Sequence, residues 1–270
     1  MGSVGADIYR TRLVAKMQRT SRYNMIYFYS NDELSSIFSN FDFKDKDILT
    51  VLGSGDQAFH LYNLGAHSVD VFDINKLTIY YYYLRRWTIK YLNKLYPDFN
   101  LSNRFISQLL DLVNISDCYE QKAYDYWRRY TKKFEDEDVD LLFYRKLLKP
   151  LIVDISNLSN ITKIMDKDHF NFYNVDISKK IDIDSQYDVI YTSNLSDYIR
   201  DNNSFEIYRD NLYKLLKKDG VVLSSNVVRF GSDENQKRIF QSYFDYYDLP
   251  KIKTSYFSEG FSPGYCYIKK

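Results

Sequence analysis

A glycine-rich turn after an apolar segment is the first place where this sequence could do chemistry. The short segment Asp47–Leu52 is typical of a strand buried in a parallel sheet. It leads directly into Gly53, Ser54, Gly55 and Asp56. Glycines at such a point allow a tight turn and a close approach of a ligand to the backbone. A second apolar segment, Ser68–Phe72, ends in Asp73, whose carboxylate could accept hydrogen bonds from ribose hydroxyls. The pattern predicts a nucleoside site; the alternative is a plain turn followed by a surface aspartate.

Two later segment ends supply further candidates. Phe170–Val175 is followed by Asp176, which could meet an adenine amino group, and by Ile177, which could lie against the ring. Asp188–Thr192 is followed by small polar residues, Ser193 and Asn194. The full set of candidate binding residues is Gly53, Ser54, Gly55, Asp56, Asp73, Ile74, Asp176, Ile177, Ser193 and Asn194.

Asp197 and Tyr198 are the candidate catalytic residues because they follow the same strand end. Asp197 is the candidate general base, which a transfer reaction needs when the attacking group carries a proton. The alternative is an acid at a helix start that satisfies backbone N–H groups. Tyr198 could contact the acceptor or the bound nucleoside, and a core position is equally open.

The elements that must position these residues form an alternating α/β pattern. The prediction is a Rossmann-like, mostly parallel seven-stranded sheet with terminal antiparallel strands, a helical N-terminal lead-in and a helical insertion after the second strand. The expected division is a helical segment 1–45, a binding domain 46–97 and 153–270, and the insertion 98–152. The expected helices include 75–95, 155–165 and 205–218; the expected later strands are 221–226, 251–257 and 264–268.

Composition narrows the function classes. The chain has 270 residues, of which 45% are hydrophobic and 27% charged, with a net charge of +1. A nucleic-acid partner is disfavoured because phosphate binding needs concentrated positive charge. Cys118, Cys266 and three histidines lack the spacing of metal ligands, so no metal is expected. No apolar segment reaches the length of a membrane span, and the expectation is a soluble cytoplasmic protein.

The succession of motifs resembles class I S-adenosylmethionine-dependent methyltransferases over residues 46–97 and 168–226. The resemblance implies S-adenosyl-L-methionine as cofactor, with the glycine loop under its methionine part. It implies Asp73 at the ribose, Asp176 at adenine, and Ser193 and Asn194 toward the reacting centre. Three features depart from the family pattern: no NPPY-type tetrad, a GSGD loop, and about a hundred residues between the second and third strands.

A smaller group is similar in these departures, namely the enzyme that starts betaine-lipid synthesis. Its Val-Asp-x-x-Asp-Ile/Leu-Asn segment is matched by Val69–Asn75, and its Ser-(Asn/Asp)-x-x-Asp-(Tyr/Trp) element by Ser193–Tyr198. That group transfers the 3-amino-3-carboxypropyl arm of the cofactor, so the resemblance leaves open which group is transferred. The acceptor, whether a small molecule, lipid or peptide, is not readable from the sequence.

Other readings stay open at this point. An NAD-dependent oxidoreductase shares the glycine loop and the acid after the second strand. An inactive binding protein that kept the fold is a third reading. Residues 98–152 are a hypothetical lid over an acceptor pocket; the alternatives are a homodimer contact or a helical pair without a role in the reaction.

Overall fold

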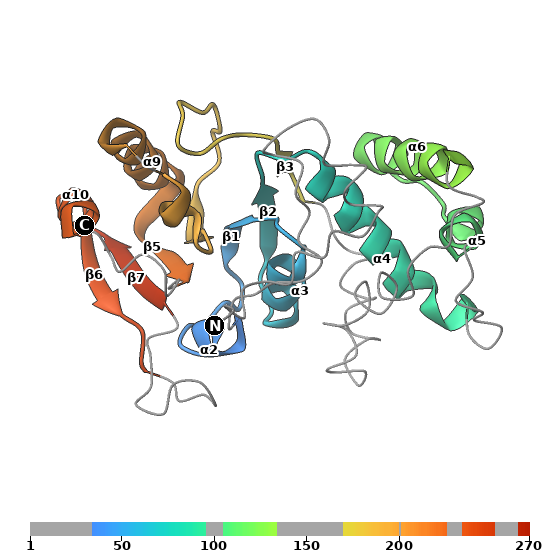
Figure 1. The fold of residues 1–270 in the computed structure, drawn as a ribbon. Coiled ribbons are helices and arrows are strands. Elements are labelled where there is room, and N and C mark those ends of the chain that lie inside the picture. The colour runs from blue at the N-terminus through green and yellow to red at the C-terminus, as the bar shows by residue number, and fades with distance from the viewer. Residues whose placement is uncertain (1–33, 96–104, 134–169, 200, 226–233, 252–263) are drawn as a thin grey trace, which may run out of the picture. The chain divides into compact units, whose positions relative to one another are not determined.

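The computed structural model describes residues 34–95, 105–133, 170–199, 201–225, 234–251 and 264–270 (Figure 1). Its helices are α2 Leu34–Phe38, α3 Asp56–Asn63, α4 Leu77–Leu95, α5 Phe105–Leu112, α6 Cys118–Lys133, the 3₁₀ helix η2 Leu195–Tyr198, α9 Asn202–Leu215 and α10 Glu234–Gln241. Its strands are β1 Asp47–Val51, β2 Ser68–Phe72, β3 Phe172–Tyr173, β4 Tyr187–Tyr191, β5 Leu216–Ser225, β6 Phe244–Asp248 and β7 Gly264–Lys269.

The described strands form one seven-stranded sheet in the order β3-β2-β1-β4-β5-β7-β6. The pairs from β3 to β5 are parallel, and β7 pairs antiparallel with both β5 and β6. This confirms the predicted Rossmann-like sheet with terminal antiparallel strands. The strand order reverses between β1 and β4, the point where open parallel sheets bind ligands beyond the carboxyl ends of their strands.

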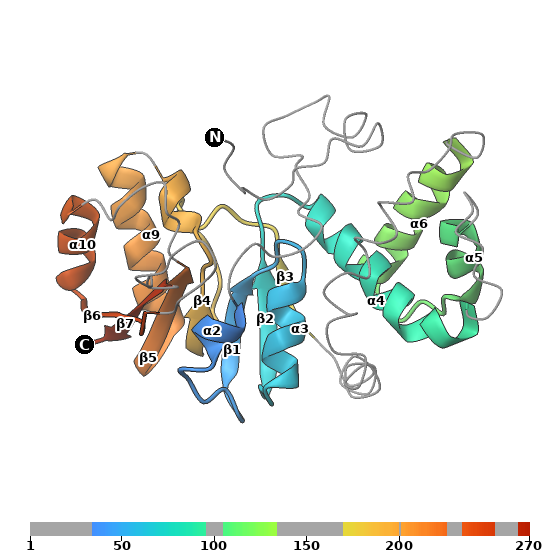
Figure 2. The same ribbon diagram turned by 60° about the horizontal axis from the view of Figure 1, so that its bottom comes forward.

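The chain forms two compact units. One contains the sheet with α2, α9 and α10, and the other contains the loop Leu52–Asp56 with α4, α5 and α6. In the sheet unit, α9 and α10 supply Phe205, Leu212 and Phe240 to a core that also contains Leu49 and Ile190 of the central strands. Figure 2 shows α9 and α10 beside β5 to β7.

The helix α2 packs on the opposite face of the sheet. Because successive side chains of a strand point to opposite faces, Tyr191 lies on the other side from Ile190. The ring of Phe38 in α2 packs edge-on against Tyr191 with 5.0 Å between centroids. A helix within the predicted 1–45 lead-in is therefore present at Leu34–Phe38; residues 1–33 lie outside the described residues.

The helical unit is built on α4, which is buried almost all round. Trp87 Nε1 donates to Glu120 Oε1 of α6 at 2.6 Å, and Trp127 Nε1 of α6 donates to the Tyr80 carbonyl at 2.7 Å. Glu120 also accepts from the backbone and hydroxyl of Ser116. The buried polar groups of Trp87, Trp127 and Glu120 thus each have a partner, as low-dielectric surroundings require.

The prediction of helix 205–218 extends too far, because α9 ends at Leu215 and the chain passes straight into β5. Lys269 Nζ donates to the carbonyls of Tyr213 and Leu216 and so completes the helix end. The predicted strand 251–257 is also misplaced as the partner of the last strand. That partner is β6, with Tyr246 opposite Tyr267. The predicted helix 155–165 lies outside the described residues.

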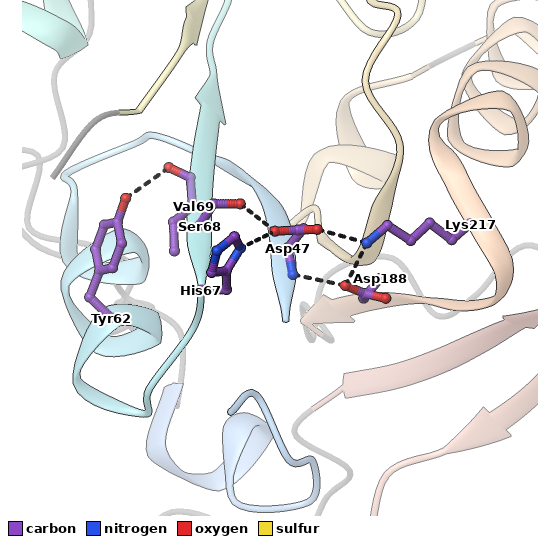
Figure 3. Close-up of polar contacts among 7 residues, drawn as sticks. All are labelled: Asp47, Tyr62, His67, Ser68, Val69, Asp188 and Lys217. Carbon is purple, nitrogen blue, oxygen red and sulfur yellow. Dashed lines mark hydrogen bonds and ion pairs between the residues drawn. The ribbon is translucent and has the colours of Figure 1, made fainter. Parts of the chain in front are cut away.

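An ionic cluster ties the amino ends of β1 and β4 to the start of β5 (Figure 3). Lys217 Nζ lies 2.7 Å from Asp47 Oδ2 and 3.0 Å from Asp188 Oδ2. Asp188 accepts the Asp47 N–H at 2.8 Å, and His67 Nδ1 lies 2.7 Å from Asp47 Oδ1. Hydrogen bonds from His67 and Lys217 hold the pKa of Asp47 well below its ordinary value. The cluster fixes the strand ends opposite the predicted site.

Replacing Lys217 by methionine should therefore destabilise the protein. We expect a loss of about 1 kcal/mol in the free energy of unfolding at pH 7, a value that allows for solvent screening of half-exposed charges. Because the folded pKa of Asp47 is depressed, its contribution is complete above about pH 4 and is lost as the pH falls below that value. Urea titrations at pH 7 and pH 3 measure both. Lys218→Met is the exposed control, and equal losses in the two variants would contradict the assignment.

Candidate functional site

The loop Leu52–Asp56 continues β1 without a gap. Gly53 and Gly55 adopt φ angles of 50° and 86°, in the left-handed region that favours glycine. The Gly55 N–H donates to the Leu52 carbonyl at 2.6 Å. The predicted tight turn is thus present, and the amide of Gly55 is used within it.

Asp56 is the first residue of α3, and its side chain is 4% exposed. Asp56 Oδ1 accepts from Arg85 Nη2 at 2.7 Å, and Asp56 Oδ2 accepts from the Ser54 hydroxyl at 2.8 Å. Arg85 Nη1 also donates to the Ser54 carbonyl at 2.6 Å. Burial opposes the charge of Arg85, but Asp56 together with Tyr81 and Tyr82 outweighs it, and the pKa of Arg85 is raised. Asp56 and the Ser54 hydroxyl are therefore engaged inside the protein.

Asp73 directly follows β2, and its backbone is held by β3. The Asp73 N–H donates to the Tyr173 carbonyl at 3.1 Å. The side-chain amide of Asn174 donates to the carbonyls of Asp73 and Ile74 at 2.8 and 3.0 Å. The side chain of Ile74 is 42% exposed, which is high for an aliphatic residue. The strand end thus presents a fixed carboxyl-bearing residue next to an apolar surface.

Asp176 follows β3 and closes its own turn. Its Oδ1 accepts from the Ser178 hydroxyl at 2.6 Å and the Ser178 backbone N–H at 3.1 Å, and Lys179 Nζ lies 3.4 Å from Oδ2. Ile177 is 5% exposed and packs in the sheet core. The apolar surface at this edge is therefore contributed by Ile74, whereas Ile177 supports the strand.

Ser193 and Asn194 follow β4 in a strained turn. Ser193 has φ of 52°, which is rare for a residue with a side chain and often marks a functional site. Its carbonyl accepts from the Ser225 N–H at 3.0 Å, so the end of β5 holds it in place. The carbonyl of Asn194 then accepts from the Asp197 N–H at 3.1 Å, which starts η2. The turn directs the chain from β4 into the predicted catalytic pair.

Asp197 lies in η2 with one carboxyl oxygen, Oδ2, buried and without a hydrogen-bond partner within the described segments. Burial raises the pKa of Asp197 to about 6. Burial raises the pKa of the nearby hydroxyls of Tyr208 and Tyr265, and the charge of Asp197 in turn contributes to this rise. Tyr198, the next residue, is 60% exposed. Asp197 therefore changes its ionisation near neutral pH, the range in which a general base works best.

The element that carries Asp197 is held by the terminal strand. The Tyr265 hydroxyl lies 2.9 Å from the Ser196 hydroxyl, and Thr192 and Ser224 share a hydrogen bond beneath it. Tyr265 belongs to β7 and pairs with Ser224 of β5. The sequence gives no signal for this contact, because it joins residues about seventy positions apart.

Sequence reasoning also missed Arg85. The spacing of Leu84 and Trp87 indicates one buried face of α4 that does not include Arg85, yet Arg85 is fully buried. Its spacing to Asp56 shows no local pattern that reveals the pair.

The described residues contain neither a metal site nor a membrane-spanning helix. Among the residues that the structure describes, no group of three His, Cys, Asp or Glu side chains is arranged to hold a metal ion. None of the described helices is long and apolar enough to cross a membrane.

Several solved structures of methyltransferases are similar to this chain. The chain is similar to a TehB-like SAM-dependent methyltransferase from Corynebacterium glutamicum, with 11% identity, 89% of each chain covered and a TM-score of 0.43. It is also similar to the N-methyltransferase NodS from Bradyrhizobium japonicum in complex with S-adenosyl-L-homocysteine. The identity is 9%, the match covers 96% of this chain and 97% of NodS, and the TM-score is 0.43. No family model and no curated protein sequence matches the chain. Because these likenesses are loose, the fold class rests on the strand order.

Proposed function

We propose that this protein binds S-adenosylmethionine and transfers its methyl group to an acceptor that carries a proton on the attacking atom. The observation that supports this most is the set of residues that follow three neighbouring strands of the sheet. A glycine turn follows β1, Asp73 with exposed Ile74 follows β2, and strained Ser193 with half-buried Asp197 follows β4. The first two suit a nucleoside, and the third suits a reacting group.

Asp56 favours this cofactor over a dinucleotide. In dinucleotide-binding folds the pyrophosphate lies at the start of the helix after the first strand, where unpaired N–H groups attract anions. Here the first turn of that helix, α3, already contains the carboxylate of Asp56, neutralised by Arg85. The N–H groups of Gly55 and Asp56 already donate within the turn, to the Leu52 carbonyl and the Ser54 hydroxyl. A diphosphate would need such donors, whereas a sulfonium cofactor brings no diphosphate. The NAD-dependent alternative is therefore the weaker one.

S-adenosylmethionine supplies, when bound, a sulfonium whose attached carbons are open to attack by a nucleophile. The residues of this chain then have two tasks. Asp73 would hold the ribose and Ile74 would lie against the flat face of the adenine. Asp197 would accept the proton that the acceptor loses as its new bond to the methyl carbon forms and the carbon–sulfur bond breaks, which leaves S-adenosylhomocysteine. Tyr198, being exposed, contacts the acceptor. Holding two reactants in line supplies much of the rate enhancement of such a transfer.

The second candidate, transfer of the 3-amino-3-carboxypropyl arm, gains less from the structure. Within the matched segment Val69–Asn75, Asp70 accepts hydrogen bonds from Asn171 and from the Tyr187 hydroxyl. Asn75 caps α4 by accepting the Leu77 N–H at 3.0 Å. Two of the motif's positions thus have structural roles that say nothing about the transferred group.

The cofactor and the transferred group can be tested together. We expect S-adenosylmethionine and S-adenosylhomocysteine, but not NAD, to raise the melting temperature, because a ligand of the native state stabilises it by mass action. Mass spectrometry after turnover should find S-adenosylhomocysteine. Methylthioadenosine would indicate transfer of the aminocarboxypropyl arm instead, and stabilisation by NAD alone would overturn the proposal.

Asp73→Ala should weaken binding of S-adenosylhomocysteine by one to two orders of magnitude. The reason is the loss of charged hydrogen bonds to ribose, about 1.5–3 kcal/mol. Isothermal calorimetry measures the affinity. Asp184→Ala, at an exposed aspartate of the same unit, is the control. Equal affinities of the two variants would remove Asp73 from the site.

Asp197→Asn should lower turnover about 10²–10⁴-fold, the usual contribution of a general base. In the wild type, the raised pKa of Asp197 predicts that the rate increases with pH through about 6, as the carboxyl loses its proton. The variant should lack this limb. Asp201→Asn is the control, because Asp201 caps α9 through the Ser204 N–H and asparagine caps equally well. An unchanged pH profile in Asp197→Asn would contradict the base assignment.

A further inference from the structure

The Ser54–Gly55 peptide group is fixed on both of its edges. Its carbonyl oxygen, on Ser54, accepts from Arg85 Nη1 at 2.6 Å. Its N–H, on Gly55, donates to the Leu52 carbonyl at 2.6 Å. Because a peptide group is planar, these two bonds set the orientation of the whole plane. The flanking glycines would otherwise give this segment wide conformational freedom.

Arg85 makes a second contact with the same loop. Its Nη2 lies 2.7 Å from Asp56 Oδ1, and both side chains are almost completely buried, at 0% and 4% exposure. The Ser54 hydroxyl completes the arrangement by donating to the other oxygen of Asp56. One guanidinium thus joins a backbone oxygen and a carboxylate two residues apart, which its planar fork of donors allows.

Stability alone explains this arrangement poorly. Removing two charges from water costs free energy that their attraction often only offsets, so an apolar replacement of similar volume is frequently neutral or stabilising. A buried pair of this kind is better explained where it fixes one conformation among several. The conformation fixed here is that of the glycine turn.

We propose that Arg85 is a positioning residue of the cofactor site, which holds the turn Leu52–Asp56 in its binding conformation from α4. This inference rests on the proposed function. It implies that the loop already has its binding conformation before the cofactor binds. The free energy of binding then does not include the entropic cost of ordering two glycines. It also implies that α4, the helix on which the α5–α6 pair packs, and the cofactor turn move as one body.

Arg85→Met tests the proposal, with Trp87→Phe as a matched control. Both positions are buried in α4, and Trp87→Phe removes one buried hydrogen bond to Glu120 without touching the loop. Calorimetry with S-adenosylhomocysteine and thermal melts are measured on each full-length variant. We expect Arg85→Met to weaken affinity at least tenfold, and Trp87→Phe to change it less than twofold despite a similar loss of melting temperature. Equal affinities in the two variants would overturn the proposal.

The double variant Arg85→Met/Asp56→Asn separates positioning from charge balance. Asp56→Asn removes the buried carboxylate that Arg85→Met leaves without its cation, so the melting temperature should return toward that of the wild type. The affinity should remain low, because the Ser54 carbonyl still lacks the hydrogen bond from Arg85. Recovery of affinity together with stability would show that Arg85 acts only through stability.

Amide hydrogen exchange tests the role of Arg85 even if the cofactor is not S-adenosylmethionine. Amides of residues 52–56 should exchange faster in the double variant than in the wild type and in Trp87→Phe. Unchanged exchange would overturn the role of Arg85. Faster exchange without any binding of S-adenosylhomocysteine by the wild type would overturn the proposed function alone.

Discussion

The pairing of β1 with two parallel neighbours is the constraint on which the structure depends. Ile48 lies opposite Val69 on one side and Val189 on the other, so β1 fixes the register of β2 and β4 together. Every residue from Ile48 to Val51 is buried, so both faces of β1 are covered and its pairing with β2 and β4 sets the register. The three strands therefore end at defined positions, and the residues that follow them in the chain are the ones available for chemistry.

Aspartates at comparable points of the fold have different roles, and their surroundings decide which. Asp56 is neutralised by a buried arginine, Asp176 closes a local turn, and Asp70 collects hydroxyl and amide donors inside the sheet unit. Asp197 has one buried carboxyl oxygen without a hydrogen-bond partner within the described segments, and burial raises its pKa. The residue type is the same in all four cases, so only the contacts distinguish a structural carboxylate from one suited to proton transfer.

Local patterns predicted much of the fold, including the strand ends that the candidate site residues follow. The strand Ser68–Phe72, the glycine turn and the placement of Asp73 follow from apolar segments and punctuating residues close together in the chain. Contacts between distant positions left no such pattern. The partner of the last strand was misplaced because β6, with the sequence FDYYD, lacks a clean alternation of apolar residues. Arg85 was missed because helical spacing places a charged residue on the surface unless a buried partner is known.

Hydrogen bonds join β2 and the residues after it to the residues that flank β3, about a hundred positions away in the chain. Asp70 accepts the Asn171 N–H at 2.8 Å, and Asn174 holds the carbonyls of Asp73 and Ile74. These bonds lie within the sheet unit and do not involve the segment that connects the two strands. The part of the connecting segment that follows α4 can therefore change in length and composition while the backbone after β2 keeps its position.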